Sequence, residues 1–338
     1  MFAGIGGFRA GLDRAGGFQC VGHCEIDKYA DASYRAIHTI REEEKYYPDA
    51  RTIDPRDLPD FDLLCGGFPC QSFSLSGKRQ GFHDTRGTLF FALARLVEAR
   101  RPAYLWLENV VGLLSHDGCR TFCTILTTLH DLGYGLEWCV LNSADFVPQS
   151  RRRVFIIGYL DSRCTGKIFP VSGAKGKALI QILGGPQGSR VYDPAGVSCT
   201  QTASAGGMGG KTGLYLIDLC AGEPRQTEIA RCITARYGQT SLSTHPRERS
   251  GVLVEGTPTE PGAAVHSFFR RGRIRRLMPR ECLRLQGFAE DQIDRLLAIT
   301  SDSQAYKQAG NSVTVNVIEA IGRRLRSVDE QLRKEDTA

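Results

Sequence analysis

The chain has 338 residues, of which 41% are hydrophobic and 24% are charged. These values are typical of a globular protein with room for one large and one smaller domain. Its apolar runs are too short to span a membrane, and its first residues lack the basic start and long apolar stretch of a signal peptide, so we expect a cytoplasmic protein.

Twelve cysteines are present, but no Cys-x-x-Cys pair occurs. Disulfide scaffolds are short secreted domains, and this chain is too long for that class. Cys20 and Cys24 would be a pair to consider as metal ligands, yet they lie in an apolar stretch that is typical of a strand. We therefore expect buried free thiols and no metal site.

The net charge of +6 is unevenly distributed along the chain. Residues 151–280 contain 20 Lys and Arg against 8 Asp and Glu, a balance of +12, while the remaining residues have a balance of −6. A basic segment on a mildly acidic body indicates either a polyanionic partner such as nucleic acid or a basic face that is merely solvated.

Strand and helix signals alternate over residues 1–160. Apolar runs that stop at Gly or polar residues predict strands at 18–26, 62–67, 104–110 and 154–160. Helical stretches between them are predicted at 28–40, 88–100 and 120–132. This alternation favours an α/β fold with a parallel sheet covered on both faces, in which a ligand binds at the carboxyl ends of the strands.

The composition changes at about residue 161, where Gly, Ser, Thr, Pro and Arg become frequent and helical periodicity fades. We predict a smaller domain of short strands and long loops at 161–269, with a weak internal repeat. Helical signals return at 279, continue through 289–299 and end with a helix over about 313–328. Residues 1–160 and 270–328 are thus expected to form one domain, followed by a C-terminal tail at 329–338.

Five short motifs contain residues suited to chemistry. A Gly-rich turn, Phe-Ala-Gly-Ile-Gly-Gly-Phe at 2–8, allows close approach of a ligand to the backbone, and Glu25 follows at the end of the next predicted strand. Taken alone, this pattern also fits many dinucleotide-binding enzymes. Cys70, in Phe-Pro-Cys-Gln directly after a strand, is either a nucleophile or a buried thiol.

The other motifs are individually ambiguous. Glu108, in Glu-Asn-Val, ends a predicted strand and faces either the same cleft as Cys70 or solvent. Gln-Ser-Arg-Arg-Arg at 149–153 precedes another strand and is otherwise a basic turn. Gly-Asn-Ser-Val at 310–313 is typical of a capped helix start.

In this order, the five motifs resemble those of the C5-cytosine DNA methyltransferase family, with Arg-Glu-Cys-Leu-Arg-Leu-Gln-Gly-Phe at 280–288 before the last. The resemblance covers about 1–160 and 270–328. It implies a Rossmann-like fold that uses S-adenosylmethionine, with the smaller loop-rich domain recognising the target. It also implies that Cys70 attacks C6 of cytosine, that Glu108 contacts N3 and the exocyclic amine, and that Arg153 helps to hold the base, whereas Arg151 supports the loop or contacts the backbone.

The resemblance implies a cofactor site built from both parts of the larger domain. Glu25 would bind ribose hydroxyls, and Asp49 would lie near the adenine amine. The remaining cofactor-binding positions are expected at Phe2, Ile5, Gly7, Ile26, Ala50, Gly67, Pro69, Leu89, Asn311 and Val313.

The resemblance further implies that the protein acts as a monomer on double-stranded DNA and flips its target base out of the duplex. The polar loop at 71–86 is similar to the family's mobile catalytic loop, with Ser76 and Lys78 near the DNA. Gln187, Arg190 and Thr200 match positions in the bacterial enzyme that reads GCGC. We therefore expect a short GC-containing site, with a GCGC-like core as the first candidate.

Three departures from the family pattern bear on these expectations. Ser204 stands where the GCGC enzyme has an aromatic residue, and the second repeat adds about 45 residues, so the target sequence stays open. Family members also have an apolar strand before the Gly-rich turn, at the position where Met1 stands here. We expect either an upstream start or a fold that tolerates the loss of this strand, and we favour the first.

Three other functions compete with this interpretation. A tRNA cytosine methyltransferase of the same fold would share Cys70 and Glu-Asn-Val, but the large Gly-rich insertion favours DNA. A non-catalytic DNA-binding protein on the same scaffold would not need Cys70, Glu108 and Arg153 together. A nicotinamide-dependent oxidoreductase would explain the Gly-rich turn but not Pro-Cys-Gln.

Overall fold

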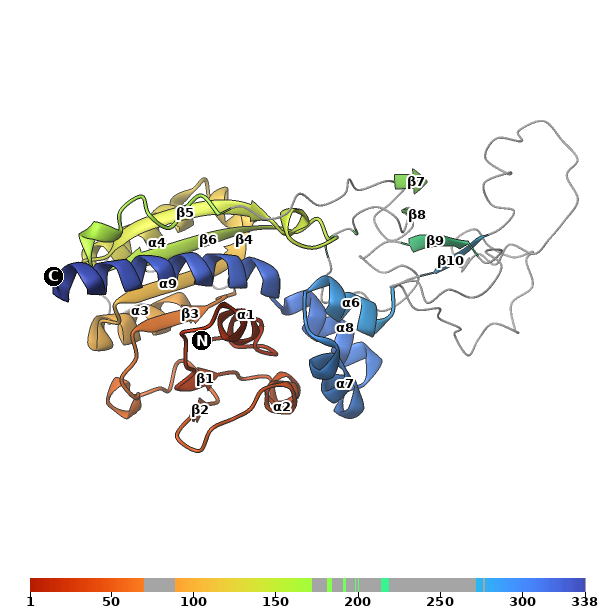
Figure 1. The fold of residues 1–338 in the computed structure, drawn as a ribbon, viewed down its shortest axis with the longest axis horizontal. Helices are drawn as coiled ribbons and strands as arrows, with labels where there is room; N and C mark the ends of the chain where they lie inside the picture. Colours follow the sequence, from red (N-terminus) through yellow and green to blue (C-terminus); the bar gives the residue numbers. More distant parts are fainter. Residues whose placement is uncertain are drawn as a thin grey trace, which may run out of the picture.

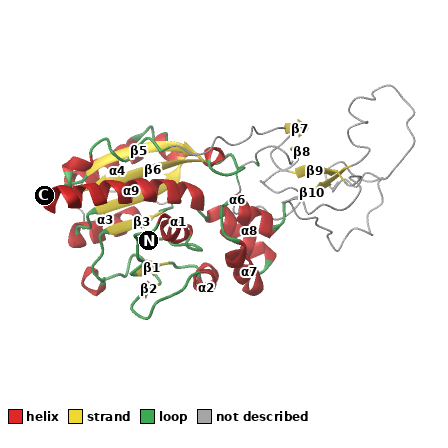
Figure 2. Ribbon diagram, in the orientation of Figure 1, coloured by secondary structure: helices red, strands yellow, loops and turns green. Residues whose placement is uncertain are grey.

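The computed structural model describes residues 1–69, 89–171 and 277–337, with short pieces at 181–183, 191–192, 198, 200, 214–218 and 272–275. Helices and strands alternate through the first two ranges, and the third range is almost entirely helical (Figure 2). The α/β class predicted from the sequence is therefore confirmed. None of the helices in these ranges is long and apolar enough to cross a membrane.

A four-stranded sheet forms the centre of the molecule. Its strands are β3 (Leu63–Gly66), β4 (Tyr104–Val110), β5 (Gly135–Asn142) and β6 (Arg152–Tyr159), in the order β3-β4-β6-β5. β3 and β4 are parallel, whereas β6 runs antiparallel to both of its neighbours. The prediction of an all-parallel sheet was therefore wrong for β6, because β6 follows β5 through a short connection that reverses the chain direction.

Helices cover both faces of this sheet (Figure 1). On one face, α1 (Gly7–Ala15) and α9 (Val315–Thr337) pack their apolar residues against Trp106 and Ile157. On the other face, α3 (Leu89–Arg100) and α4 (Arg120–Asp131) pack against Leu105 and Ile156. Adjacent residues of a strand thus belong to two separate cores, because successive side chains point to opposite faces of the sheet.

A second, smaller pair of strands lies beside this sheet without being hydrogen-bonded to it. β1 (Gly22–Cys24) and β2 (Lys45–Tyr47) are parallel, and α2 (Lys28–Ile37) connects them. The amino group of Met1 donates to the Cys65 carbonyl on β3 at 2.7 Å, and the Ala3 amide donates to the Cys24 carbonyl on β1 at 2.9 Å. Met1–Ala3 is therefore the described segment that links the two sets of strands.

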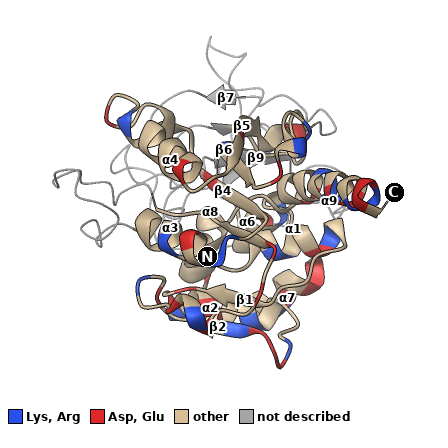
Figure 3. Cartoon of the chain, turned by 90° about the vertical axis from the view of Figure 1, so that its left-hand side faces the viewer, with Lys and Arg blue, Asp and Glu red and all other residues tan. Residues whose placement is uncertain are grey.

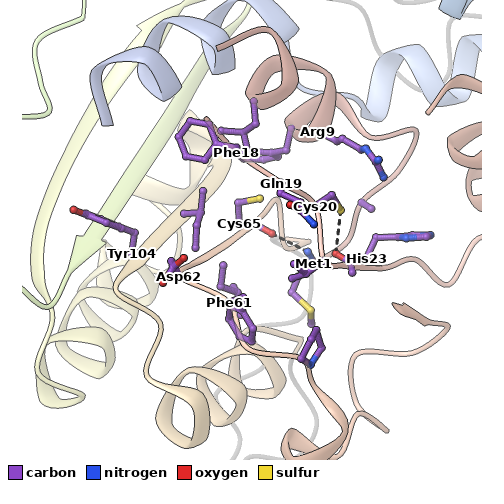
Figure 4. A pocket seen from close by; sticks show the side chains of 18 of the residues that line it. Met1, Arg9, Phe18, Gln19, Cys20, His23, Phe61, Asp62, Cys65 and Tyr104 are labelled. Carbon is purple, nitrogen blue, oxygen red and sulfur yellow. Dashed lines mark hydrogen bonds between the residues drawn. The ribbon is translucent and has the colours of Figure 1, made fainter. Parts of the chain in front are cut away.

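A cavity of about 520 Å³ lies between β1 and β3 (Figure 4). Side chains from α1, α9 and both strands line it, including Leu12, Phe18 and Leu63. Met1 also lines it.

The C-terminal helices differ in their bounds from the prediction. α6 (Pro279–Leu285), α7 (Glu290–Ile299) and α8 (Asp302–Asn311) form a compact group beside the sheet. Asn311 ends α8 and Ser312 is its C-cap, so this motif is a helix end and not a helix start. α9 continues to Thr337, and Leu332 is buried in the core, so residues 329–337 are helical and do not form a separate tail.

Among the described residues within or at the edge of the predicted second domain, four short strands are seen. They are β7 (Gln181–Leu183), β8 (Val191–Tyr192), β9 (Leu214–Asp218) and β10 (Gly272–Arg275), in the order β10-β9-β8-β7. Short 3-10 helices complete the described elements: η1 (Pro55–Asp57), η3 (Val111–Leu114), η4 (Ser143–Asp145) and η5 (Ser162–Cys164).

Candidate active site

The end of β4 places Glu108 and Asn109 at the edge of the sheet. The four residues before Glu108 are buried, which fixes the strand in the core. The Asn109 side-chain amide donates to the Phe68 carbonyl at 2.8 Å, and Asn109 itself is buried. This bond ties the end of β4 to the segment that leads into Cys70, two residues after Phe68.

Glu108 forms an ion pair with Arg153, whose Nε lies 3.0 Å from the Glu108 Oε1. Arg153 comes from β6, which pairs with β4 so that Arg153 faces Val110 across the ladder. Both side chains are nearly buried, with 11% of Glu108 and 16% of Arg153 exposed. Burial raises the pKa of Glu108, although Arg153 and Arg151 act in the opposite direction.

Gly67 lies against the same carboxylate. A Cβ atom at this position would be 3.0 Å from the Glu108 Oε2, tighter than nearly all real contacts. The glycine backbone and Arg153 therefore enclose Glu108 between them. A nearly buried carboxyl with a raised pKa, beside a guanidinium, is suited to donating a proton or a hydrogen bond to a substrate ring.

Arg151 occupies a different position from Arg153. Its guanidinium is buried and donates to the carbonyls of Gly310 and Ser312 at 3.0 and 2.8 Å. Burial lowers the pKa of Arg151 to about 9. In this structure Arg151 supports the backbone between α8 and α9.

A buried polar network continues from Arg151 into the C-terminal helices. Gln286 donates to the Ala309 carbonyl at 2.8 Å and accepts from the Thr314 hydroxyl at 3.1 Å. The Ser143 and Thr314 hydroxyls are 2.8 Å apart, and Gln149 donates to the Leu285 carbonyl at 2.8 Å. Among these residues, Gln286, Thr314 and Ser143 had no predicted role. Gln286 is the C-cap of α6, Ser143 begins η4 and Thr314 precedes α9, so these three residues share no local sequence signal.

The Gly-rich turn and Glu25 form a second part of the candidate site. The Glu25 Oε2 accepts from the Gly4 amide at 2.7 Å, and its Oε1 accepts from the Asp27 amide at 2.8 Å. Gly7 packs on Val313, since a Cβ at Gly7 would be 2.8 Å from the Val313 Cγ2. The structure thus brings together predicted cofactor residues from the Gly-rich turn, the end of β1 and the C-terminal part of the chain.

Several other predicted cofactor positions are less directly available. The side chains of Ile5 and Ala50 are buried in the core, so only their backbone can contact a ligand. Asp49 forms an ion pair with Arg51, whose NH2 lies 2.6 Å from the Asp49 Oδ2. By contrast, Ile26 is 68% exposed beside Glu25, which leaves an apolar side chain for a flat ligand ring.

The remaining predicted cofactor residues are at or near the surface: Phe2, Gly67 and Leu89 are partly buried, whereas Pro69 and Asn311 are exposed.

Most predicted DNA-contacting residues, and the nucleophile, lie outside the described residues. These are Cys70, Ser76, Lys78, Gln187 and Arg190.

Thr200 is described, and its hydroxyl donates to the Ser150 carbonyl at 2.5 Å. Ser198 bonds to the same segment, because its carbonyl accepts from the Ser150 amide at 2.7 Å. Ser198 and Thr200 are therefore both hydrogen-bonded to Ser150, the residue that precedes Arg151.

Charges on the described residues are mixed. Basic and acidic residues lie side by side around α2 and β2 and at the end of α9 (Figure 3). Pairs such as Arg35–Asp31 and Arg333–Asp329 account for part of this pattern. The excess of positive charge belongs to residues 151–280, most of which lie outside the described ranges.

Comparisons with known proteins agree with these observations. The family of C-5 cytosine-specific DNA methylases matches residues 1–327. The type II methyltransferase M1.ScrFI of Lactococcus lactis subsp. cremoris is 34% identical, over 99% of this chain and 79% of the relative. The type II methyltransferase M.HhaI of Haemophilus parahaemolyticus is 31% identical, over 95% of this chain and 91% of the relative.

The fold is also shared with solved structures. A Spodoptera frugiperda DNMT2 mutant superposes with a TM-score of 0.64 at 18% identity, covering 97% of both chains. At this identity the likeness concerns the fold alone. The match over nearly the whole chain and the identity to curated relatives lead to one conclusion: this chain belongs to the C-5 cytosine-specific DNA methylase family.

Proposed function

We propose that this protein transfers a methyl group from S-adenosylmethionine to carbon 5 of a cytosine in double-stranded DNA. The observation that carries the proposal is the Glu108–Arg153 pair, which is held at the end of β4 and joined through Asn109 to the segment leading into Cys70. In this proposal, the Cys70 nucleophile would join the acid of raised pKa, Glu108, and the fixed cation of Arg153 at one edge of the sheet.

The chemistry follows from the weak reactivity of cytosine C5. The Cys70 thiolate adds to C6, while Glu108 donates to N3 so that the ring can accept electron density. Arg153 holds Glu108 in place and stabilises charge that develops on the base. The bound cofactor supplies the methyl group; C5 then loses its proton and the Cys70 thiolate is expelled.

The residues at the amino-terminal turn fit this cofactor. Glu25 has a carboxylate at the end of β1, and the left-handed glycines leave the backbone of the turn open to close approach. The N–H groups in the first turn of α1 have no carbonyl partner within the helix, which suits a carboxylate group. The exposed Ile26 offers an apolar contact for an aromatic ring.

The DNA is proposed to contact residues from two parts of the chain. Ser76 and Lys78 would lie along the phosphates once the target base is flipped out. Residues 161–269 would form the target-recognition domain, in which Gln187, Arg190 and Thr200 read a short GC-containing site. A tRNA substrate is the weaker alternative, because the curated relatives reported above are type II methyltransferases of restriction-modification type.

Bisulfite sequencing of plasmid from cells that express the protein tests this proposal. Methylated cytosines at one short recurring sequence are expected, and none with the Cys70→Ser variant as control. Purified protein incubated with duplex DNA or tRNA and labelled cofactor separates the two substrates. Label in tRNA alone, or methylation that persists in the Cys70→Ser variant, would contradict the proposal.

A further inference from the structure

The Gly-rich turn before α1 has a backbone conformation that needs support. Gly4 and Gly6 have φ values of +55° and +80°, in the left-handed region that favours glycine. The Gly6 amide donates to the Ala3 carbonyl at 2.8 Å, and helix α1 begins at the next residue. Because a cofactor must meet this backbone directly, small rotations of its peptide groups would move the N–H groups that face the ligand.

Glu25 supports this turn from one side, through its bond to the Gly4 amide. His38 supports it from another side. His38 is the C-cap of α2, is 7% exposed, and its Nε2 lies 3.1 Å from the Ile5 carbonyl oxygen. With the Gly6 amide bonded to Ala3, both polar ends of the Ile5–Gly6 peptide group are therefore held.

The direction of the His38 bond follows from its chemistry. Burial lowers the pKa of His38 to about 4, so the ring is neutral near pH 7. A carbonyl oxygen only accepts hydrogen bonds, so the Nε2 atom must carry the ring proton. His38 is thus fixed in one tautomer, with Nε2–H directed at Ile5.

The imidazole also lies directly against the turn. A Cβ atom at Gly6 would be 2.2 Å from the His38 Nε2 and 2.8 Å from the Tyr34 Cδ2. The His38 and Tyr34 rings are 4.7 Å apart and come from the same face of α2. The His38 and Tyr34 rings therefore enclose Gly6. The His38 ring also donates a hydrogen bond to the turn, which a Phe ring at the same position could not do.

We propose that His38 is a positioning residue for the cofactor: its Nε2–H fixes the orientation of the Ile5–Gly6 peptide and thereby the first N–H groups of α1 that receive the ligand. This inference rests on the proposed function for the identity of the ligand, S-adenosylmethionine. His38 acts through the turn and does not touch the reacting atoms.

Substitution of His38 separates this role from simple core packing. We expect His38→Phe, which keeps a ring but has no donor, to raise the Kd for S-adenosylmethionine about tenfold, as for loss of one buried hydrogen bond. His38→Gln has an amide N–H that reaches the same carbonyl and is expected to restore affinity to within about threefold of the original protein. The KM for DNA, and kcat at saturating cofactor, should stay within about twofold.

A matched control uses the neighbouring ring. Tyr34→Phe keeps the contact with Gly6 but removes the hydroxyl that accepts from Arg9 at 3.1 Å. This variant should lose thermal stability while its cofactor Kd stays unchanged, which shows that a weaker α2 alone does not impair binding. A cofactor Kd for folded His38→Phe within twofold of the original, or no rescue by His38→Gln, would overturn the proposal.

A measurement on the unaltered protein applies even where a variant fails to fold. Nitrogen-15 NMR of histidine side chains is expected to show His38 with its proton on Nε2. A proton on Nδ1 would overturn the proposal without any reference to the cofactor. Absence of S-adenosylmethionine binding by the unaltered protein, by contrast, would count against the proposed function.

Discussion

The two sets of strands in the catalytic body differ in how they are held. The four-stranded half has a continuous ladder and a helical layer on each face, and residues such as Trp106, Leu107 and Ile157 are fully buried. The β1–β2 half meets it across a cavity of about 520 Å³ and is linked to it by the short Met1–Ala3 segment and by packing of Cys24 with Leu96 of α3.

The two proposed tasks of the site are divided between these halves. Glu108 and Arg153 lie on the continuous sheet, where a rigid ladder fixes their separation. Glu25 and the Gly-rich turn lie at the boundary, where side chains such as His38 provide the support instead. We therefore expect substitutions in the first half to change kcat and substitutions at the boundary to change cofactor affinity.

The largest expected effect concerns the nucleophile. Cys70→Ser should abolish methyl transfer, because a serine hydroxyl stays protonated where a thiol can ionise, while cofactor affinity is largely kept. Methylation assays with labelled cofactor measure the first quantity, and calorimetry measures the second. A covalent complex with DNA containing 5-fluorocytosine should form only when Cys70 is present; near-normal turnover of the serine variant would refute this role.

Glu108→Gln is expected to lower kcat by roughly 10²–10⁴-fold, the usual contribution of a positioned acid. Because burial raises the pKa of Glu108, its protonated form persists to higher pH than for an exposed carboxyl. The activity of the original protein should then decline on the alkaline side as Glu108 ionises, and this decline should be missing in the variant.

Glu137→Gln is the matched control for Glu108→Gln. Glu137 lies on β5 of the same sheet and accepts from the Gly166 amide at 2.9 Å, away from the candidate site. The Glu137→Gln substitution should leave kcat within about twofold of the value for the original protein. An equal loss in both variants would mean that the carboxylates support the sheet and that Glu108 has no special role.

Much of the four-stranded half could be predicted from sequence. β3, β4, β6, α3 and α4 follow the apolar runs and helical stretches closely, because these elements are buried and their pattern is strong. β5 was missed: it contains only the short apolar run Trp138–Leu141, and most of its residues are half-buried. β2, with the sequence Lys-Tyr-Tyr, was missed because it is short and mostly exposed, and α8 was missed because polar residues predominate in its sequence.

The candidate site was predictable where chemistry is concentrated in a motif. Glu108, Arg153 and Glu25 each lie in a recognisable local pattern, whereas Cys70, also in such a pattern, lies outside the described residues. Asn109 lies in Glu-Asn-Val, but its contact and that of His38 were not predicted, because their partners lie 41 and 33 residues away in the sequence. Such contacts are set by how β4 and α2 pack in three dimensions, and no spacing along the chain reports them.

The boundary half should also respond to pH through His38. Its pKa is about 4 in the folded protein against an ordinary value of 6.5, so between these values the unfolded chain binds the extra proton more tightly. Stability is therefore full above pH 6.5 and falls as the pH decreases towards 4, by up to about 3 kcal/mol. Urea unfolding of the original protein and of His38→Gln at several pH values measures this difference. Parallel pH profiles for the two proteins would contradict it.

The smallest expected effect concerns packing at the cavity between the four-stranded half and the β1–β2 half. Cys65 on β3 lines the cavity, whereas Cys164 is completely buried in the core beside the four-stranded sheet. Cys65→Leu adds methyl groups to empty space and should raise the free energy of unfolding by about 1 kcal/mol. Cys164→Leu adds the same atoms where no space exists and should lower it by about 1–3 kcal/mol. The two substitutions change the same number of atoms, so intrinsic differences between Cys and Leu cancel in the comparison. Thermal unfolding of both variants would show opposite shifts in Tm if the halves are packed as described, and equal shifts would mean that the cavity closes in solution.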